Sequence, residues 1–580
     1  MGALSVGKLI VPVSMEAYDA QIKYTNCCSL LSLRQRRVVM SLKHSETTPR
    51  TALYLFTLFL CSLAARPAAA QNGSQLKDWN LFAKDPAAPS DRKLTCKALM
   101  SLTGYEFAIN SATLVPAAAD VPEHCRVAGQ ILPQIQFEVN LPTAWNGRLY
   151  MFGNGGYAGE AFDAPGRIAS RNQALKHGFT VAATNTGHEA SLEPLGTFAL
   201  DRQKLLDYSF RAVHVTAMTA KQIAATFYQA QVSHSYFDGC STGGRQGLMS
   251  AQRFPEDFDG IAVGAPVLNL SGSMLRHLWR AQALQAAPIT KEKLSIIADR
   301  VYAKCDKLDG LADGLIDDPR KCPFHPATDL PLCSGNFDGP KCFTTAQITA
   351  LEKIYDGVKS NGKLIFPGQP LGAEIEAMGP TGMSSGWEPW MVSQTGRTTD
   401  AQFSESFLRY VAFPKPDPEY NISNFNFDTD VEKLGPSARM TDAADPDLSR
   451  FQARGGKIVM YFGWADPALS PFMGVDYYEK VESQIGPSTT DFYRLFMVPG
   501  MFHCRGGVGV SAFDAFTPLV QWVEKSIPPD EIIGSRVVDD KVVRTRPLCP
   551  YPQVAKYKGS GSIDDAKNFA CAKPTLAASE

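Results

Sequence analysis

The chain has 580 residues, of which 57 are Lys or Arg and 58 are Asp or Glu, and 44% are hydrophobic. This length and apolar content can bury a large core, so the composition predicts a globular protein. The charges nearly cancel and form no basic run, which argues against nucleic-acid binding, so we expect no nucleic-acid partner.

Residues 1–70 are predicted to be removed from the working protein. Within them, residues 51–65 form an uncharged, mostly apolar run that ends shortly before Ala68-Ala69-Ala70, a pattern typical of a signal peptide cleaved after the third alanine. A membrane anchor is the alternative, but the run falls short of the roughly 20 residues that span a bilayer. Residues 1–39 are an unusual extension ahead of a signal peptide, whereas a start at Met40 would give a signal peptide of ordinary length. We therefore expect a secreted or periplasmic protein without membrane attachment after cleavage.

The cysteine pattern agrees with export. Three of the 13 cysteines lie in residues 1–70, and an even set of ten remains, which favours disulfides in an oxidising compartment. Pairing of neighbours along the chain predicts the bridges Cys96–Cys125, Cys305–Cys322, Cys333–Cys342 and Cys549–Cys571. Cys240 and Cys504 are then left over.

The first part of an α/β domain is predicted over residues 71–266. Residues 135–141 alternate apolar and polar side chains, as in a half-buried strand, and residues 148–152 form the next strand candidate. That strand runs into a glycine-rich loop, where α/β-hydrolases present one backbone N–H of the oxyanion hole. Gly156, or Gly155, is therefore the expected donor, and a flexible surface loop is the alternative.

The stretch Gly-Cys-Ser-Thr-Gly at residues 239–243 is the central motif. It lies between a β-prone run and the opening of a helix, which is the context of a nucleophile elbow. Small flanking residues are needed because the serine takes a strained backbone conformation. The motif predicts Ser241 as nucleophile and the N–H of Thr242 as the second oxyanion donor, although five residues alone occur readily by chance.

A large insertion is predicted after the elbow. Residues 258–266 and 457–462 both resemble buried parallel strands, but about 190 residues separate them, far too many for one crossover. We therefore predict a lid domain over residues 267–450, with the second part of the α/β domain at residues 451–580.

The predicted lid contains an acidic loop. Asp306, Asp309 and Asp313 are interleaved with glycines, so the chain can curl around a hard cation such as calcium. The aspartate spacing excludes an EF-hand. An acidic surface turn is the alternative, but repulsion among three clustered carboxylates favours a bound cation.

Aromatic residues gather later in the lid. Trp387, Trp390 and Phe403 lie close in sequence to Arg397. They could form walls for a flat aromatic acyl group, with Arg397 available to a carboxylate. The alternative is that they form the core of the lid itself.

The remaining catalytic candidates follow late strands. Asp466 comes directly after the strand at residues 457–462, and His503 follows the final strand at residues 493–498. This order matches the Ser, Asp, His order of α/β-hydrolases. His188 and His214 precede the serine, so they are read as structural.

The two unpaired cysteines give a geometric check on this assignment. Cys240 directly precedes Ser241, and Cys504 directly follows His503. A hydrogen bond between the serine and the histidine would bring the cysteines close enough for a disulfide. The triad therefore predicts a Cys240–Cys504 bridge.

Together, the motifs at residues 239–243, 306–315, 463–467 and 503–504 resemble those of the tannase and feruloyl esterase family, over essentially the whole mature chain. The resemblance implies an α/β-hydrolase fold with a lid, structural calcium and hydrolysis of esters of aromatic acids such as gallate or hydroxycinnamate. The sequence is also similar to the branch that cleaves mono(2-hydroxyethyl) terephthalate.

The resemblance assigns Ser241 as nucleophile, Asp466 and His503 as its partners, and Gly156 and Thr242 as oxyanion donors. It also places calcium between the carboxylates of Asp306, Asp309 and Asp313 and the carbonyls of Leu311 and Leu315. The lid residues Arg397, Trp387 and Phe403 are the expected substrate contacts.

The expected activity is a two-step acyl transfer through an acyl-enzyme, by a chain that acts as a monomer on a small aromatic ester. A serine peptidase or an acyltransferase on the same scaffold is an alternative, because fold and triad do not determine the acyl acceptor. A catalytically silent protein that binds aromatic ligands is another.

Overall fold

The computed structural model describes residues 79–81, 90–91, 93–119, 121–335, 337–374, 377–378, 384–393 and 397–574. The chain divides into two units, Met1–Pro67 and Ala68–Glu580, and every described residue belongs to the second. The expected signal segment, residues 1–70, lies outside the described residues. None of the helices in the described ranges is long and apolar enough to cross a membrane.

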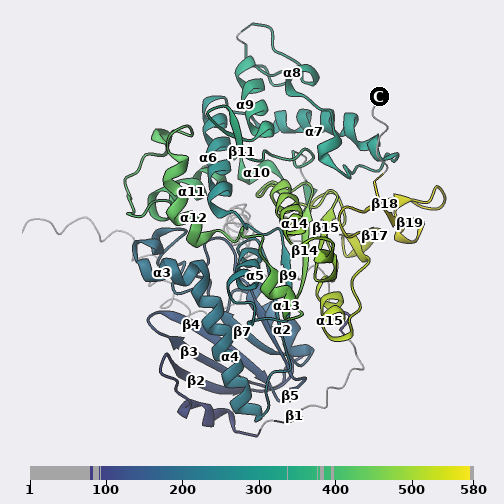
Figure 1. Cartoon of the computed structure of the whole chain (residues 1–580). Coiled ribbons are helices and arrows are strands. Elements are labelled where there is room, and N and C mark those ends of the chain that lie inside the picture. Colours follow the sequence, from purple (N-terminus) through teal and green to yellow (C-terminus); the bar gives the residue numbers. More distant parts are fainter. Residues whose placement is uncertain are drawn as a thin grey trace, which may run out of the picture. The chain divides into compact units, whose positions relative to one another are not determined.

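A nine-stranded mixed sheet forms the centre of the described part of the chain (Figure 1), in the order β15-β14-β9-β8-β6-β7-β4-β3-β2. The strands from β15 to β7 run parallel, and β4, β3 and β2 continue the sheet in antiparallel pairing. The strands are β2 (Phe107–Val115), β3 (His124–Ile131), β4 (Ile135–Pro142), β6 (Arg148–Phe152), β7 (Thr180–Thr184), β8 (His234–Cys240), β9 (Gly260–Gly264), β14 (Lys457–Gly463) and β15 (Tyr493–Val498). The strands expected from the sequence near residues 135, 148, 258, 457 and 493 correspond to β4, β6, β9, β14 and β15.

Helices cover both faces of the sheet. Side chains of neighbouring strand residues point to opposite faces, so Tyr236 and Phe237 of β8 belong to different apolar clusters. The helices of the Tyr236 cluster are α2 (Pro165–Lys176) and α15 (Phe516–Lys525), and those of the Phe237 cluster include α4 (Ala212–Tyr228), α5 (Thr242–Arg253) and α14 (Pro471–Ile485). Parallel strands with helices on both faces make a three-layer α/β architecture.

The long insertion lies between β9 and β14, which are neighbours in the sheet. Its helices are α6 (Leu270–Ala286), α7 (Lys291–Cys305), α8 (Pro326–Asp329), α9 (Thr345–Asp356), α10 (Trp387–Trp390), α11 (Thr399–Ser406), α12 (Gly435–Thr441) and α13 (Ser449–Ala453). Figure 1 shows α6, α7, α8 and α9 gathered beyond one end of the sheet. The predicted lid, residues 267–450, falls within this insertion, and the fold is that of an α/β-hydrolase with an inserted lid.

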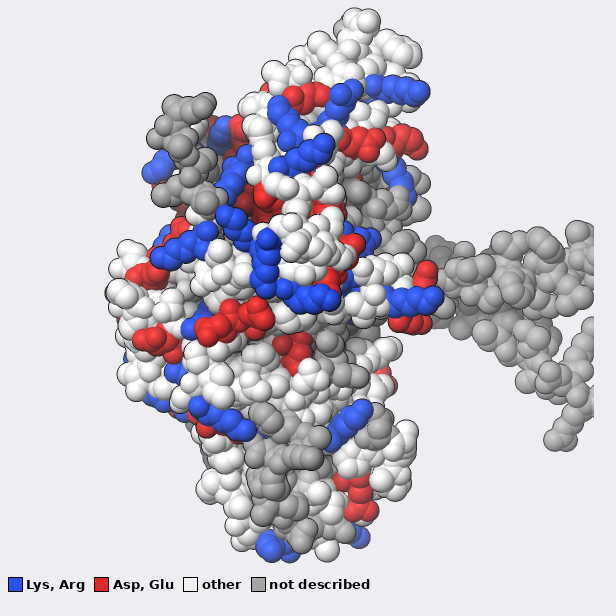
Figure 2. All heavy atoms as spheres, turned by 90° about the vertical axis from the view of Figure 1, so that its right-hand side faces the viewer, with Lys and Arg blue, Asp and Glu red and all other residues white. Residues whose placement is uncertain are grey.

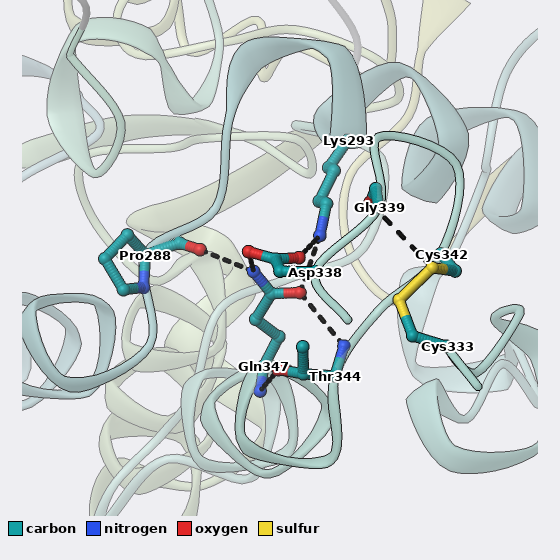
Figure 3. Close-up of a disulfide and its surroundings, with 8 residues drawn as sticks. All are labelled: Pro288, Lys293, Cys333, Asp338, Gly339, Cys342, Thr344 and Gln347. Atoms are coloured by element: carbon teal, nitrogen blue, oxygen red, sulfur yellow. Dashed lines mark hydrogen bonds and ion pairs between the residues drawn. A yellow bond between two sulfur atoms is a disulfide. The ribbon is translucent and has the colours of Figure 1, made fainter. Parts of the chain in front are cut away.

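A buried lysine stabilises the far end of the insertion (Figure 3). Lys293 of α7 is almost inaccessible to solvent, forms an ion pair with Asp338 and donates to Oε1 of Gln347 at 2.8 Å. Gln347 also completes a capping box with Thr344, which fixes the start of α9. The Cys333–Cys342 disulfide closes the same loop. Without these partners, burying the charge of Lys293 would be strongly unfavourable.

Short antiparallel pairs complete the structure. These are β1 (Ser90–Asp91) with β5 (Ala144–Trp145), β10 (Val358–Ser360) with β11 (Lys363–Phe366), β12 (Ala377–Met378) with β13 (Ser384–Ser385), β16 (Ile532–Val538) with β17 (Lys541–Leu548), and β18 (Val554–Tyr557) with β19 (Phe569–Ala572). On the face in Figure 2, Lys and Arg side chains lie among Asp and Glu side chains, so neither sign dominates it.

The described part of the chain contains five disulfides. They are Cys96–Cys125, Cys240–Cys504, Cys305–Cys322, Cys333–Cys342 and Cys549–Cys571. The pairing is the one expected from the sequence.

Candidate active site

Ser241 lies at the sharp turn between β8 and α5. Its backbone has φ of 62° and ψ of −119°, a conformation that L residues adopt only under strain. Its N–H donates to the carbonyl of Gly264 at 2.9 Å, which anchors the turn to the neighbouring strand β9. A Cβ on Gly239 would lie 2.7 Å from the backbone of Gly243. The glycines of the motif are therefore required by this close approach.

Asp466 and His503 meet in the loops that follow β14 and β15. Oδ2 of Asp466 lies 2.8 Å from Nδ1 of His503. Oδ1 of the same fully buried carboxylate accepts from the backbone N–H groups of Ala468 at 2.8 Å and Leu469 at 2.9 Å. The carboxylate is thus held on both oxygens, and it orients the imidazole with Nε2 directed away from the aspartate.

Ser241 and His503 line one small cavity of about 30 Å³. Its other walls are mainly apolar and aromatic, and they include Tyr157, Trp390 and Phe403. The ring centroids of Trp390 and His503 lie 5.8 Å apart in an edge-to-face contact. A larger cavity of about 160 Å³ lies beside Trp464, but its lining contains no serine or histidine. The smaller cavity is therefore the candidate active site.

Two backbone N–H groups lie at the same cavity. Gly156, with φ of 51°, and Thr242, the first residue of α5, both line it. The Thr242 hydroxyl donates to the carbonyl of Gly156, which ties the two segments together. The N–H of Gly155 is already used, because it donates to Glu160 at 3.2 Å. No acceptor for the N–H groups of Gly156 and Thr242 is found in the described ranges, so both can donate to an oxyanion.

The Cys240–Cys504 disulfide fastens this arrangement. It joins residues 264 positions apart, with the Cα atoms separated by 6.0 Å. Cys504 has φ of 63°, in the left-handed region, as does Ser241. The bond therefore links the strained turn at Ser241 directly to the loop that carries His503.

The structure brings only one of the three expected lid contacts to the cavity. Phe403 lines it, but Trp387 packs in the core of the insertion, with its ring 5.7 Å from that of Tyr355. Trp390 takes the position at the cavity instead. The two tryptophans diverge because the backbone of Glu388 between them is extended, with φ of −93° and ψ of 128°.

Arg397 also lies away from the cavity that contains Ser241. Its side chain is 58% exposed and forms an ion pair with Glu405. The start of α11 directs the guanidinium toward this neighbouring acid and solvent. The sequence could not show this, because proximity along the chain does not determine which side of a short helix faces the cavity.

The acidic loop turns sharply at Gly310 and Gly314, where φ is 94° and 74°. Its carboxylates accept from the loop's own backbone: Asp306 Oδ1 from the N–H of Gly314 at 2.8 Å, and Asp309 Oδ1 from that of Leu311 at 2.9 Å. Within the described ranges, no group of three or more His, Cys, Asp or Glu side chains is arranged to hold a metal ion. Calcium binding therefore stays a prediction.

The sequence reasoning missed Asp317 as a member of this acidic group. Asp317 lies partly buried beside Asp309, and desolvation, followed by the charge of Asp309, raises the pKa of Asp317 to about 8. Asp313 is bound by Arg546, whose Nη2 donates to Oδ2 at 2.7 Å. The oxygen atoms suit a hard cation, although Arg546 already neutralises part of their charge.

Two further histidines have structural partners. His188 stacks on Phe198, and its Nε2 lies 3.1 Å from the carbonyl of Tyr157. Burial lowers the pKa of His188 to about 4. His214 contacts the buried Asp257 at 2.9 Å.

His277 is a cavity residue that the sequence did not reveal. It lies on α6 and lines the cavity with Ser241 and His503. Its partner Asp400 lies 123 residues later, on α11. No local motif connects the two, so only the packing of α6 against α11 could identify them.

Known proteins resemble this chain along most of its length. The family model described as "Tannase and feruloyl esterase" matches residues 119–572. The chain is 35% identical over 560 residues to "Mono(2-hydroxyethyl) terephthalate hydrolase" from Piscinibacter sakaiensis, covering 84% of this chain and 93% of that protein. It is 31% identical over 480 residues to "Probable feruloyl esterase B" from Aspergillus clavatus, covering 77% and 86%. The solved structure of feruloyl esterase B from Aspergillus oryzae matches with a TM-score of 0.70 at 26% identity, covering 82% of this chain and 100% of that one.

Proposed function

Since the chain belongs to the tannase and feruloyl esterase family, we propose that it cleaves esters of aromatic acids through an acyl-enzyme on Ser241. The protein is a carboxylic ester hydrolase, as are the named relatives. The observation that carries the proposal is the 2.8 Å contact between Asp466 and His503 at the cavity that contains Ser241.

In this mechanism, Nε2 of His503 takes the proton of the Ser241 hydroxyl as its oxygen attacks the ester carbonyl. Asp466 holds the ring in the tautomer with Nδ1 protonated and stabilises the imidazolium that forms. The N–H groups of Gly156 and Thr242 donate to the tetrahedral oxyanion. His503 then gives its proton to the departing alcohol, and a water molecule resolves the acyl-enzyme by the same steps in reverse order.

The aromatic acyl class is supported by the cavity walls. Tyr157, Phe403 and Trp390 present three rings within one small space, and aromatic rings pack favourably in offset or edge-to-face geometry. Galloyl, feruloyl and terephthalate monoesters are the candidate substrates. Named relatives include a feruloyl esterase and a hydrolase of mono(2-hydroxyethyl) terephthalate.

The test compares the wild type with Ser241→Ala on methyl gallate, methyl ferulate and mono(2-hydroxyethyl) terephthalate. Loss of the nucleophile should lower kcat by several orders of magnitude, and a fluorophosphonate should label the wild type alone. Retained turnover in Ser241→Ala would refute the mechanism. Faster cleavage of matched amides would indicate a peptidase. Ester synthesis with added alcohols would indicate an acyltransferase. Tight binding of aromatic ligands without labelling would indicate a silent binding protein.

We also propose that the protein is exported, which the five disulfides of the described residues support.

We further propose a structural calcium ion held by the carboxylates of Asp306, Asp309 and Asp313 with the carbonyls of Leu311 and Leu315. Calcium prefers such oxygen ligands and would neutralise the clustered charge without taking part in the ester chemistry. Excess calcium should therefore raise Tm relative to a chelator by several degrees in the wild type and less in Asp309→Asn. Equal Tm values with calcium and with chelator would contradict the proposal.

A further inference from the structure

His277 and Asp400 form a buried pair beside the active-site cavity. Their side chains are 1% and 0% exposed, and Nδ1 of His277 lies 2.5 Å from Oδ1 of Asp400. Arg280, one turn along α6, donates to both oxygens of the same carboxylate at 2.7 and 2.8 Å. The carboxylate therefore has a charged partner as well as the imidazole.

These contacts determine the tautomer of His277. Nδ1 of His277 has two close neighbours, Oδ1 of Asp400 at 2.5 Å and Nη2 of Arg280 at 2.8 Å. Nη2 also donates to Oδ1 at 2.7 Å, so the carboxylate serves as its acceptor. Two lone pairs cannot face each other at 2.5 Å, so a proton lies between Nδ1 and Oδ1. Burial is the main cause that lowers the pKa of His277, whereas Arg280 and His277 outweigh burial and lower the pKa of Asp400. The imidazole is thus neutral, the carboxylate is ionised, and the shared proton belongs to Nδ1. Nε2 then carries a lone pair and can only accept a hydrogen bond.

Within the described ranges, Nε2 of His277 has no hydrogen-bond partner. The atom is not fully enclosed by protein, so a ligand can reach it. His277 borders the cavity, with its ring centroid 5.9 Å from that of Trp390 and 6.3 Å from that of Phe403. Trp390 in turn contacts His503. The cavity is therefore lined both by His503, the proposed general base, and by His277, whose Nε2 can accept a hydrogen bond.

We propose that His277 determines substrate specificity: its Nε2 accepts a hydrogen bond from a ring hydroxyl of the aromatic acyl group, so the enzyme favours esters of hydroxylated aromatic acids. This inference rests on the proposed esterase function. Asp400 is a positioning residue, because it holds the imidazole in the tautomer that accepts.

The chemistry of the cavity favours a hydroxyl over a carboxylate. A phenol can give its proton to Nε2, whereas a carboxylate has only lone pairs to offer. Arg397, the cation expected to clamp a carboxylate, is paired with Glu405 outside the cavity. A buried acceptor also discriminates strongly, since a ligand without a donor leaves it desolvated and unpaired.

The same network reaches the catalytic loop. Arg280 donates to the carbonyl of Pro467 at 2.9 Å, and Arg276 donates to that of Ala468 at 2.9 Å. Pro467 directly follows Asp466. The elements that orient His277 therefore also support the loop that orients His503, so a test of specificity must use ratios of kcat/KM rather than total activity.

The decisive measurement is kcat/KM for methyl 4-hydroxycinnamate and methyl cinnamate, which differ only in the ring hydroxyl. We expect the wild type to prefer the hydroxylated ester by about tenfold or more. His277→Leu should bring the ratio close to one, and His277→Gln should restore part of it, because its amide oxygen can accept. Leu278→Met, a volume-conserving change at a buried residue of α6 that does not line the cavity, should keep the wild-type ratio.

Equal kcat/KM for the two esters in the wild type would overturn the inference without any variant. The inference can therefore be refuted even if the His277 variants fail to fold. A wild-type preference that persists in folded His277→Leu would also overturn it. Labelling of Ser241 by a fluorophosphonate separates the two levels of the proposal. A labelled enzyme without hydroxyl preference refutes the role of His277 alone, whereas absence of labelling in folded protein refutes the proposed function as well.

Discussion

Replacing both cysteines of the Cys240–Cys504 bridge by alanine should cost stability and activity together. The bridge closes a loop of 264 residues, for which the chain-entropy relation gives a stabilisation of about 5 to 6 kcal/mol as an upper value. Activity should fall as well, because the bridge connects Ser241 to His503 through adjacent residues. A displacement of about 1 Å between reacting groups lowers kcat on the order of 100-fold.

The matched control is the double variant Cys549→Ala/Cys571→Ala. This bridge closes a loop of 22 residues, so the same relation gives about 3 kcal/mol. It lies in the C-terminal strand pairs, and neither cysteine lines the cavity of Ser241. We therefore expect a lower urea midpoint in both variants and a reduced kcat only in the first.

The assay is initial-rate hydrolysis of a saturating aromatic methyl ester, with urea unfolding monitored on the same preparations and mass spectrometry to verify the remaining bridges. Equal kcat in the Cys240→Ala/Cys504→Ala variant and the wild type would refute the role of the bridge at the active site. An equal loss of kcat in both double variants would refute it too, because general destabilisation would then be sufficient.

Two further predictions concern single residues. Asp466→Asn should lower kcat by about 10⁴-fold, with KM nearly unchanged, since an amide no longer favours the required tautomer of His503; a loss below tenfold in steady-state kinetics would contradict the assignment. Burial lowers the pKa of His188 to about 4, so between pH 6.5 and 4 the unfolded chain binds a proton that the folded chain does not. The free energy of unfolding should therefore decrease as the pH is lowered from 6.5 to 4, by up to about 3 kcal/mol from this residue. His188→Gln should show a shallower pH dependence of the urea midpoint, and an identical slope in variant and wild type would exclude His188 as a cause.

The sequence by itself was enough to predict the central residues of the candidate active site. Ser241, Asp466 and His503 each follow a buried strand, and parallel strands bring their carboxyl ends to one edge of the sheet. Their order along the chain was therefore enough to predict that they meet. The pairing of Cys240 with Cys504 followed from the same geometry, as each is the immediate neighbour of a predicted catalytic residue.

Only the tertiary structure decided what surrounds them. Trp387 and Trp390 are the same residue type and lie three residues apart. Because the backbone of Glu388 between them is extended, Trp387 packs in the core of the insertion and Trp390 lies at the cavity. His277 and Asp400 come from helices 123 residues apart and meet through the packing of α6 against α11. Strand periodicity and short motifs are local properties that a sequence records, whereas the inner surface of the lid results from contacts between distant segments, and those contacts exist only in the folded chain.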